Sequence, residues 1–151
     1  MDQLKILLAD DDADDRFFFD EAIKAAVIPA VLNTVDNGEK LMHYLITNNE
    51  NLPDALFLDL NMPRKNGSEC LLAIKQDDKL KDLPVIIYST SLHKEIADIL
   101  FNNGAHYYIK KGNSAEMQSV LNHILILLKE NKFSRPGREH FILHTKNLTI
   151  K

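Results

Sequence analysis

The stretch LKILLADDDADD, residues 4–15, joins an apolar run directly to a cluster of five aspartates. Carboxylates this close repel one another, and each resists the loss of its water. Such a cluster therefore needs a compensating charge, for which a hard divalent cation such as Mg²⁺ is the natural candidate. A second apolar run, ALFL at residues 55–58, also ends in an aspartate, Asp59. Two strands that both end in carboxylates predict a metal site that handles phosphoryl groups.

The composition predicts one globular domain with an ordinary core. The chain has 151 residues, which matches the size of a single domain. Its net charge of -4 argues against a nucleic-acid-binding surface, which needs basic patches. No apolar stretch is long enough for a membrane span, and no signal-peptide pattern opens the chain. The single cysteine, Cys70, has no partner for an internal disulfide and is expected to be a buried structural thiol, so that we expect a cytoplasmic protein.

Short apolar runs alternate with helical patterns along the chain. The runs occupy residues 4–9, 30–35, 55–58, 85–88 and 106–110, and the helical patterns occupy 12–26, 36–46, 67–76, 93–103 and 113–128. This alternation is typical of βαβ units, and nearly continuous apolar runs are typical of buried parallel strands. Because such crossovers are right-handed, the pattern predicts an α/β fold with a doubly wound, five-stranded parallel sheet and helices on both faces.

Polar residues at the helix ends support these boundaries. Asp12 is expected to cap the first helix, with the aspartates after it in the first turn, where carboxylates favour the helix dipole. Asp36 and Glu39 are expected to form a capping box for the second helix. Asn113 is expected to open the last helix, and Gly104 to end the one before it.

Ligands of doubly wound sheets bind at the carboxyl ends of the strands. That edge is expected to carry Asp10, Asp11, Asp59, Ser89 and the pair Lys110-Lys111. The residues with useful chemistry therefore fall where this class of fold places its sites.

Several ordered motifs carry a resemblance to a known family. They are ILLADD at residues 6–11, DLNMP at 59–63 followed by Gly67, PVIIYS at 84–89, and Gly104-Ala105 leading to Tyr108 and Lys111. Over residues 4–129 the chain resembles the receiver domain of bacterial two-component response regulators, the CheY-like family. The resemblance implies a flavodoxin-like strand order, 2-1-3-4-5. Within the family, the chain is most similar to single-domain regulators associated with phytochromes.

The resemblance also implies roles at the acidic end of the sheet. Asp59 would be the phosphoacceptor, which takes a phosphoryl group from a histidine kinase or a histidine phosphotransfer protein. Mg²⁺ would be held by Asp59, by Asp11 directly, by Asp10 through water, and by the backbone carbonyl of Asn61.

Three further residues receive roles from the same resemblance. Lys111 would pair with Asp59 and then with a phosphoryl oxygen, and Ser89 would donate a hydrogen bond to the phosphoryl group. Tyr108 would be the switch aromatic, which turns inward when phosphorylation draws Ser89 toward the site. The face that changes would be the one formed by the fourth helix, the fifth strand and the fifth helix.

Gly112 departs from the family pattern, in which a proline usually follows the conserved lysine. A cis peptide bond before a non-proline residue costs about 3 kcal/mol, so we expect a trans bond here. Glycine is then expected to shape the loop through a positive φ. The departure also leaves Lys110 as a competitor of Lys111, although the spacing from Gly104 favours Lys111.

The chain divides into a receiver domain, residues 1–132, and a C-terminal extension, residues 133–151. The extension contains two β-prone pieces, at 140–144 and 148–150, which suggest a hairpin on the output face or across a homodimer. With no room for an effector domain, the output is expected to be contact with another protein or relay of the phosphoryl group, without nucleic acid or membrane.

The sequence leaves two alternative functions open. The chain could be a docking module with a receiver fold that no longer accepts phosphate. It could also be an aspartate-based phosphatase, because the D-x-D pattern at residues 10–12 occurs at the first strand of such enzymes, but the second acidic pair that their chemistry needs is missing after the fourth strand.

Overall fold

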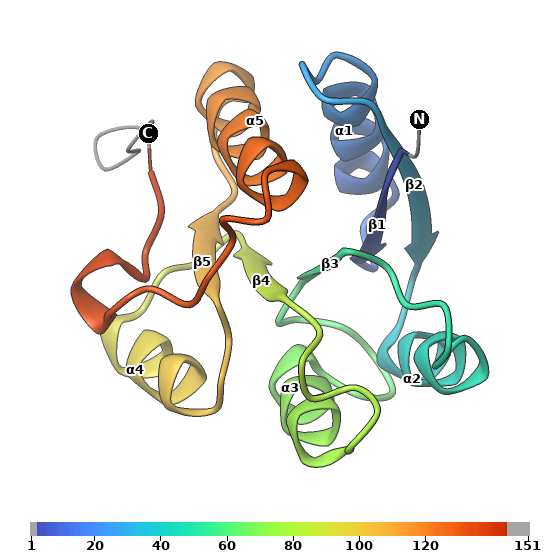
Figure 1. Ribbon diagram of the computed structural model, residues 1–151. Coiled ribbons are helices and arrows are strands. Elements are labelled where there is room, and N and C mark those ends of the chain that lie inside the picture. The colour runs from blue at the N-terminus through green and yellow to red at the C-terminus, as the bar shows by residue number, and fades with distance from the viewer. Residues whose placement is uncertain (1–2, 145–151) are drawn as a thin grey trace.

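A five-stranded parallel sheet forms the middle layer of the computed structural model, which describes residues 3–144 (Figure 1). The strands are β1 (Leu4–Ala9), β2 (Ala30–Val35), β3 (Ala55–Leu58), β4 (Val85–Ser89) and β5 (Tyr107–Lys110). The helices are α1 (Ala13–Lys24), α2 (Gly38–Thr47), α3 (Gly67–Gln76), α4 (Lys94–Asn102) and α5 (Ser114–Lys129). The strand order is β2-β1-β3-β4-β5, which confirms the predicted topology.

The register of the central strands determines where the acidic residues lie. Ala9 at the end of β1 is opposite Val35 of β2 on one side and Leu58 of β3 on the other. The amide of Asp59 donates to the carbonyl of Ala9 at 2.9 Å. Asp10, which follows β1, and Asp59, which follows β3, therefore lie next to each other at the carboxyl edge of the sheet.

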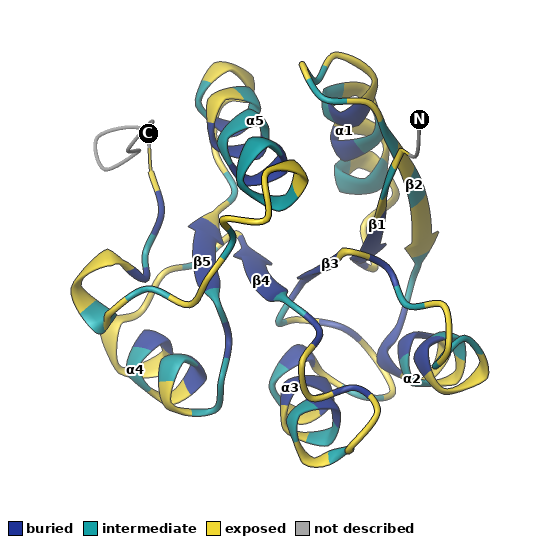
Figure 2. Ribbon diagram, viewed as in Figure 1, coloured by how far each residue is buried: buried dark blue, intermediate teal, exposed yellow. Residues whose placement is uncertain are grey.

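Helices cover both faces of the sheet. Helices α1 and α5 lie on one face, and α2, α3 and α4 lie on the other (Figure 1). Along β1, Ile6 and Leu8 pack into the core under α1 and α5, and Leu7 and Ala9 pack into the core on the opposite side. The strands β3, β4 and β5 are almost wholly buried (Figure 2). Each large apolar side chain buried in this way contributes about 1.5–3 kcal/mol to folding.

Most of the predicted helix ends are correct. Asp12 caps α1, because its side chain accepts hydrogen bonds from the amides of Asp14 and Asp15. Asn113 caps α5 through the amide of Glu116. Gly104 follows α4 with a φ of 101°, a left-handed conformation that glycine adopts readily.

The capping box predicted at Asp36 and Glu39 is wrong. Asn37 caps α2 by accepting from the amide of Lys40 at 2.8 Å, and the Asp36 carboxylate instead forms an ion pair with the Lys40 ammonium at 2.9 Å. A capping box does occur at α3, between Asn66 and Glu69, where the sequence analysis did not place one.

Cys70 lies fully buried on α3, as predicted. Burial raises the pKa of its thiol to about 11, so the reactive thiolate form is scarce at neutral pH. The thiol therefore acts as a small apolar side chain in the core under α2 and α3.

The extension begins after α5 and returns to the sheet. A 3₁₀ turn, Arg138–His140, is followed by Ile142, which forms a parallel bridge with Tyr108 of β5. The first predicted β-prone piece, 140–144, therefore pairs with the edge of the sheet. The second, 148–150, lies outside the described residues. Within residues 3–144, no helix combines the length and the apolar character that a membrane span requires.

Candidate functional site

Three aspartates meet at the carboxyl ends of β1 and β3. Asp10 is fully buried, Asp59 is 4% exposed, and Asp11 is exposed. Each offers one carboxylate oxygen, and these oxygens all lie within 4.8 Å of one another. The structure thus brings together the three residues whose carboxylates were predicted to hold Mg²⁺.

Local hydrogen bonds fix the loop after β1. One oxygen of the Asp10 carboxylate accepts from the amide of Asp12 at 3.0 Å, and the guanidinium of Arg16 donates to the Asp10 carbonyl at 2.8 Å. These contacts join the end of the strand to the first turn of α1. The Asp10 side chain is therefore held toward the pocket before any ligand binds.

Close packing fixes the loop after β3. A Cβ atom on Gly67 would lie 2.3 Å from the carbonyl oxygen of Asp59, which is shorter than any allowed contact. Only glycine lets the start of α3 approach the acceptor strand so closely. The amide of Asn61 lies 3.4 Å from the Asp59 carboxylate, which places this predicted residue in the wall of the pocket.

Lys111 supplies the positive charge of the site from the loop after β5. Its ammonium lies 2.7 Å from the Asp10 carboxylate, 2.8 Å from that of Asp15 and 3.8 Å from that of Asp59. The predicted partner, Asp59, is thus the most distant of the three. Lys110 is exposed, so the structure places Lys111 in the pocket.

Asp15 is a site residue that the sequence analysis missed. Its position in the first turn of α1 explained it fully as a favourable charge near the helix dipole, and the structure confirms that position. Its second role depends on a lysine 96 residues away, and no local pattern indicates such a contact.

Burial and neighbouring charges shift the pKa values of Asp59 and Lys111 in the pocket. Burial raises the pKa of Asp59 to about 7; Lys111 opposes this shift, and the charges of Asp10 and Asp11 add to it. Burial lowers the pKa of Lys111, but hydrogen bonds to Asp10 and Asp15 more than reverse that effect, so its net shift is upward. One ammonium therefore faces more carboxylates than it can neutralise.

This donor set fits a hard divalent cation. Mg²⁺ and Mn²⁺ prefer oxygen ligands, and clustered carboxylates provide both the ligand atoms and the charge. Asp10, Asp11 and Asp59 are the residues that would hold such an ion.

Ser89 and Tyr108 continue from the pocket toward the edge of the sheet. Ser89 is fully buried at the end of β4, and its carbonyl accepts from the amide of Lys111 at 2.7 Å. Tyr108 is fully buried, and its hydroxyl donates to the carbonyl of Ser91 at 2.5 Å. Both predicted residues thus lie inside the protein, Ser89 as the last residue of β4 and Tyr108 within β5.

Gly112 corrects one expectation. Among residues 3–144 there is no cis peptide bond, so the bond before Gly112 is trans, as expected. Its φ is not positive, however, and a Cβ atom there would meet only the carbonyl oxygen of Lys110, at 4.0 Å. The expected positive φ is wrong. The backbone at Gly112 has an ordinary conformation, and the loop has room for a side chain there.

Comparisons with known proteins agree with the geometry. Residues 6–122 match the family described as "Response regulator receiver domain". Response regulator Rcp1 of Synechocystis sp. is 30% identical over 113 residues, which cover 72% of this chain and 77% of Rcp1. The probable C4-dicarboxylate response regulator DctR of Bacillus subtilis is 34% identical over 107 residues, which cover 71% of this chain and 45% of DctR.

Two solved structures show the same architecture. The phosphorylated cyanobacterial phytochrome response regulator RcpA superposes with a TM-score of 0.78 at 30% identity, covering 86% of this chain and 96% of RcpA. The Mn²⁺-bound form of Rcp1 superposes with a TM-score of 0.75 at 27% identity, covering 89% of this chain and 99% of Rcp1. The sequence match and the fold together show that the chain belongs to the response regulator receiver domain family, whose members are phosphorylation-dependent switches of two-component systems.

Proposed function

We propose that Asp59 is the phosphoacceptor of this switch. The observation that carries the proposal is the meeting of Asp59 with Asp10, Asp11 and the ammonium of Lys111 in one largely buried pocket. A strand-end aspartate with no chemical role would not need two further carboxylates and a lysine around it. The arrangement is suited to receiving a group that is itself negatively charged.

The reaction follows from the chemistry of the carboxylate. An oxygen of Asp59 attacks the phosphorus of a phosphohistidine, the P–N bond breaks, an acyl phosphate forms, and the imidazole leaves with the bonding electron pair and takes up a proton. Receiver domains bind Mg²⁺ or Mn²⁺ at an acidic pocket, and here Asp10, Asp11 and Asp59 would hold the ion, with the Asn61 carbonyl as a further ligand. A bound ion would screen the charge of the incoming phosphoryl oxygens.

Lys111 and Ser89 recognise the product. The Lys111 ammonium lies 3.8 Å from the Asp59 carboxylate, so a small movement brings it to a phosphoryl oxygen attached there. The Ser89 hydroxyl then donates a hydrogen bond to another of these oxygens. Both residues favour the phosphorylated state, because each then donates a hydrogen bond to a phosphoryl oxygen that the unphosphorylated protein lacks.

The output passes through Tyr108. Its ring lies inside the protein, and its hydroxyl contacts Ser91 in the loop after β4. Movement of Ser89, the last residue of β4, displaces this loop and changes the space available to the ring. The surface formed by α4, β5 and α5 reports the change to a downstream protein or to a second copy of the chain. The upstream partner is a histidine kinase or a histidine phosphotransfer protein. The chain is a signalling module whose chemistry is confined to its own phosphoryl group.

Intact-mass spectrometry tests this proposal directly. The protein is incubated with Mg²⁺ and acetyl phosphate, as wild type and as Asp59→Asn. One added phosphoryl group on the wild type, absent from Asp59→Asn and lost when EDTA replaces Mg²⁺, supports Asp59 as the acceptor. No addition, or equal addition to both proteins, supports instead a docking module that does not use phosphate.

A further inference from the structure

Residues 133–144 form a strap that closes one edge of the sheet. The amide of Tyr108 donates to the carbonyl of Phe141 at 3.0 Å, and the amide of Leu143 donates to the carbonyl of Tyr108 at 2.9 Å. Both backbone polar groups of Tyr108 on this side are therefore paired with the strap. The edge of β5 that would otherwise face solvent is occupied by the chain itself.

Aromatic packing anchors the strap from inside. The ring of Phe141 is fully buried, and its centroid lies 5.3 Å from that of Phe101 on α4 and 6.3 Å from that of Tyr108. At the start of the strap, the ring of Phe133 stacks on His106 at 5.4 Å. The strap therefore supplies part of the core on this side of the sheet.

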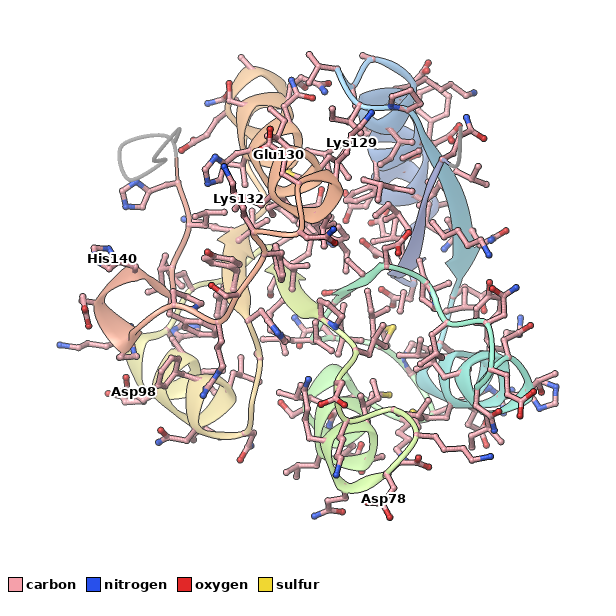
Figure 3. The ribbon with its side chains drawn as sticks, viewed as in Figure 1. Asp78, Asp98, Lys129, Glu130, Lys132 and His140 are labelled. Atoms are coloured by element: carbon pink, nitrogen blue, oxygen red, sulfur yellow. The ribbon has the colours of Figure 1, made fainter. Side chains whose placement is uncertain are left out.

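Two arginines anchor the strap from outside. Arg138 donates to the carboxylate of Asp98 on α4 at 2.6 Å. Figure 3 labels Asp98 on α4 and His140 in the 3₁₀ turn that also contains Arg138. Arg135 lies 4.1 Å over the ring of Phe101 and donates to the carbonyl oxygens of Phe101 and Ala105, at the end of α4. These contacts hold the strap to α4 and to the loop that leads into β5.

A short series of contacts links the strap to the pocket. Phe141 packs on the Tyr108 ring, and the Tyr108 hydroxyl reaches the carbonyl of Ser91. The amide of Ser91 lies 3.4 Å from the hydroxyl of Ser89, whose carbonyl accepts from the amide of Lys111. The pose of the Tyr108 ring is thus constrained from the strap on one side and from the pocket on the other.

We propose that this strap holds Tyr108 in its inward pose and thereby couples docking of residues 133–144 to phosphorylation of Asp59. The direction of the coupling rests on the proposed function, in which the inward ring accompanies the phosphorylated state. A docked strap then favours phosphorylation, since it stabilises in advance the ring position that phosphorylation requires. Coupling is reciprocal, so phosphorylation tightens the strap.

The test combines amide hydrogen exchange with phosphorylation by acetyl phosphate and Mg²⁺. Exchange is followed by NMR at the amides of Tyr108 and Leu143, and phosphoryl addition by intact mass. Phe141→Ala removes the inner anchor and Phe141→Leu keeps most of its volume. Phe17→Ala is the matched control, because that phenylalanine is 58% exposed on α1. Arg138→Gln loosens the strap from outside without a cavity in the core, in case Phe141→Ala fails to fold.

We expect Phe141→Ala and Arg138→Gln to speed exchange at both amides and to slow phosphoryl addition about fivefold or more. Phe141→Leu should show a smaller effect, and Phe17→Ala should behave like the wild type. In the wild type, phosphorylation should slow exchange at the same amides.

Two results overturn the coupling while leaving the proposed function intact. The first is rapid exchange at both amides in the wild type, because the strap would then not be docked. The second is faster exchange in the strap variants with an unchanged rate of phosphoryl addition. Failure of the wild type to gain a phosphoryl group is different, because it defeats the proposed function and the coupling together.

Discussion

The ammonium of Lys111 and the carboxylate of Asp10 lie 2.7 Å apart, although 101 residues separate them in the sequence. Asp10 is fully buried, and the Lys111 side chain is 9% exposed. Charges removed from water to this extent are costly unless they are paired. The pair therefore serves stability in the metal-free protein, in addition to any part that Lys111 takes in the chemistry.

Lys111→Gln should destabilise the metal-free protein. Removing the ammonium leaves buried carboxylates without compensation, which costs about 3 kcal/mol in such pairs. Urea unfolding with EDTA should reveal this loss, and excess Mg²⁺ should restore much of it, because a cation in the acidic pocket replaces the missing charge. Lys110→Gln, at the exposed neighbouring position, is the control. An equal loss in both variants would contradict the prediction.

Asp11→Asn should have the opposite effect on stability. Asp11 adds repulsion to a pocket that already contains two buried carboxylates, so its removal should raise the metal-free free energy of unfolding by about 1 kcal/mol. The same change removes a proposed metal ligand, so that Mg²⁺ should no longer raise the melting temperature. Melting curves with and without Mg²⁺ measure both effects. A variant that is less stable without metal would show that Asp11 adds no net repulsion, and a variant that Mg²⁺ still stabilises would show that Asp11 is not needed to hold the ion.

Asp15 and Lys111 should be energetically coupled. Their side chains lie 2.8 Å apart, and Asp15 lies outside the group of three carboxylates suited to the metal. Asp15→Asn should therefore cost about 1 kcal/mol in the wild-type background and nearly nothing when Lys111 is already glutamine. Urea unfolding of the four proteins in EDTA gives the interaction energy. Additive costs would mean that the contact does not contribute to stability.

His106 should make the protein sensitive to mild acid. Burial lowers its pKa to about 4, with further lowering by the charges of Lys75 and Arg135. Between pH 6.5 and 4 the unfolded chain therefore binds a proton that the folded protein does not, so stability falls as the pH falls through this range.

The expected loss from this group between pH 7 and pH 5 is about 2 kcal/mol. His106→Gln keeps an acceptor for the amide of Val85, which donates to the imidazole at 3.3 Å. Urea unfolding at both pH values should give a smaller loss in this variant than in the wild type. Identical losses would show that His106 titrates normally in the folded protein.

Gly112→Ala should be tolerated or slightly stabilising. The backbone there needs no positive φ, and a Cβ atom meets no neighbour closer than 4.0 Å. Alanine restricts the unfolded chain, which adds about 0.5 kcal/mol to stability. Gly104→Ala is the matched comparison, because a φ of 101° is strained for alanine and should make that variant less stable. Similar melting temperatures for the two variants would contradict this distinction.

The sheet and its acidic edge could be predicted from sequence because both depend on local patterns. Apolar runs specify buried strands, and right-handed crossovers leave few topologies. The carboxyl ends of neighbouring parallel strands then meet, so Asp10, Asp11 and Asp59 could be placed together from the sequence alone.

Partners chosen by geometry across the chain could not be predicted in the same way. Asp36 and Asn37 are both good caps by residue type, and only the backbone path into α2 selects Asn37. Asp15 already had a sufficient local explanation, and its contact with Lys111 depends on how the loop after β5 folds back. The apolar piece at residues 140–144 was identified as β-prone, but periodicity does not say which strand edge such a piece will join.

The strap also has a consequence for solubility. An uncovered edge strand presents unpaired amides and carbonyls, to which strands of other molecules can hydrogen-bond, and this pairing leads to aggregation. In the described part of the chain, β5 has only four residues, and the three from Tyr107 to Ile109 are buried. The hydrogen bonds that the strap makes to Tyr108 therefore keep this apolar edge strand from pairing with neighbouring molecules. A protein whose strap is released should remain dispersed only at low concentration.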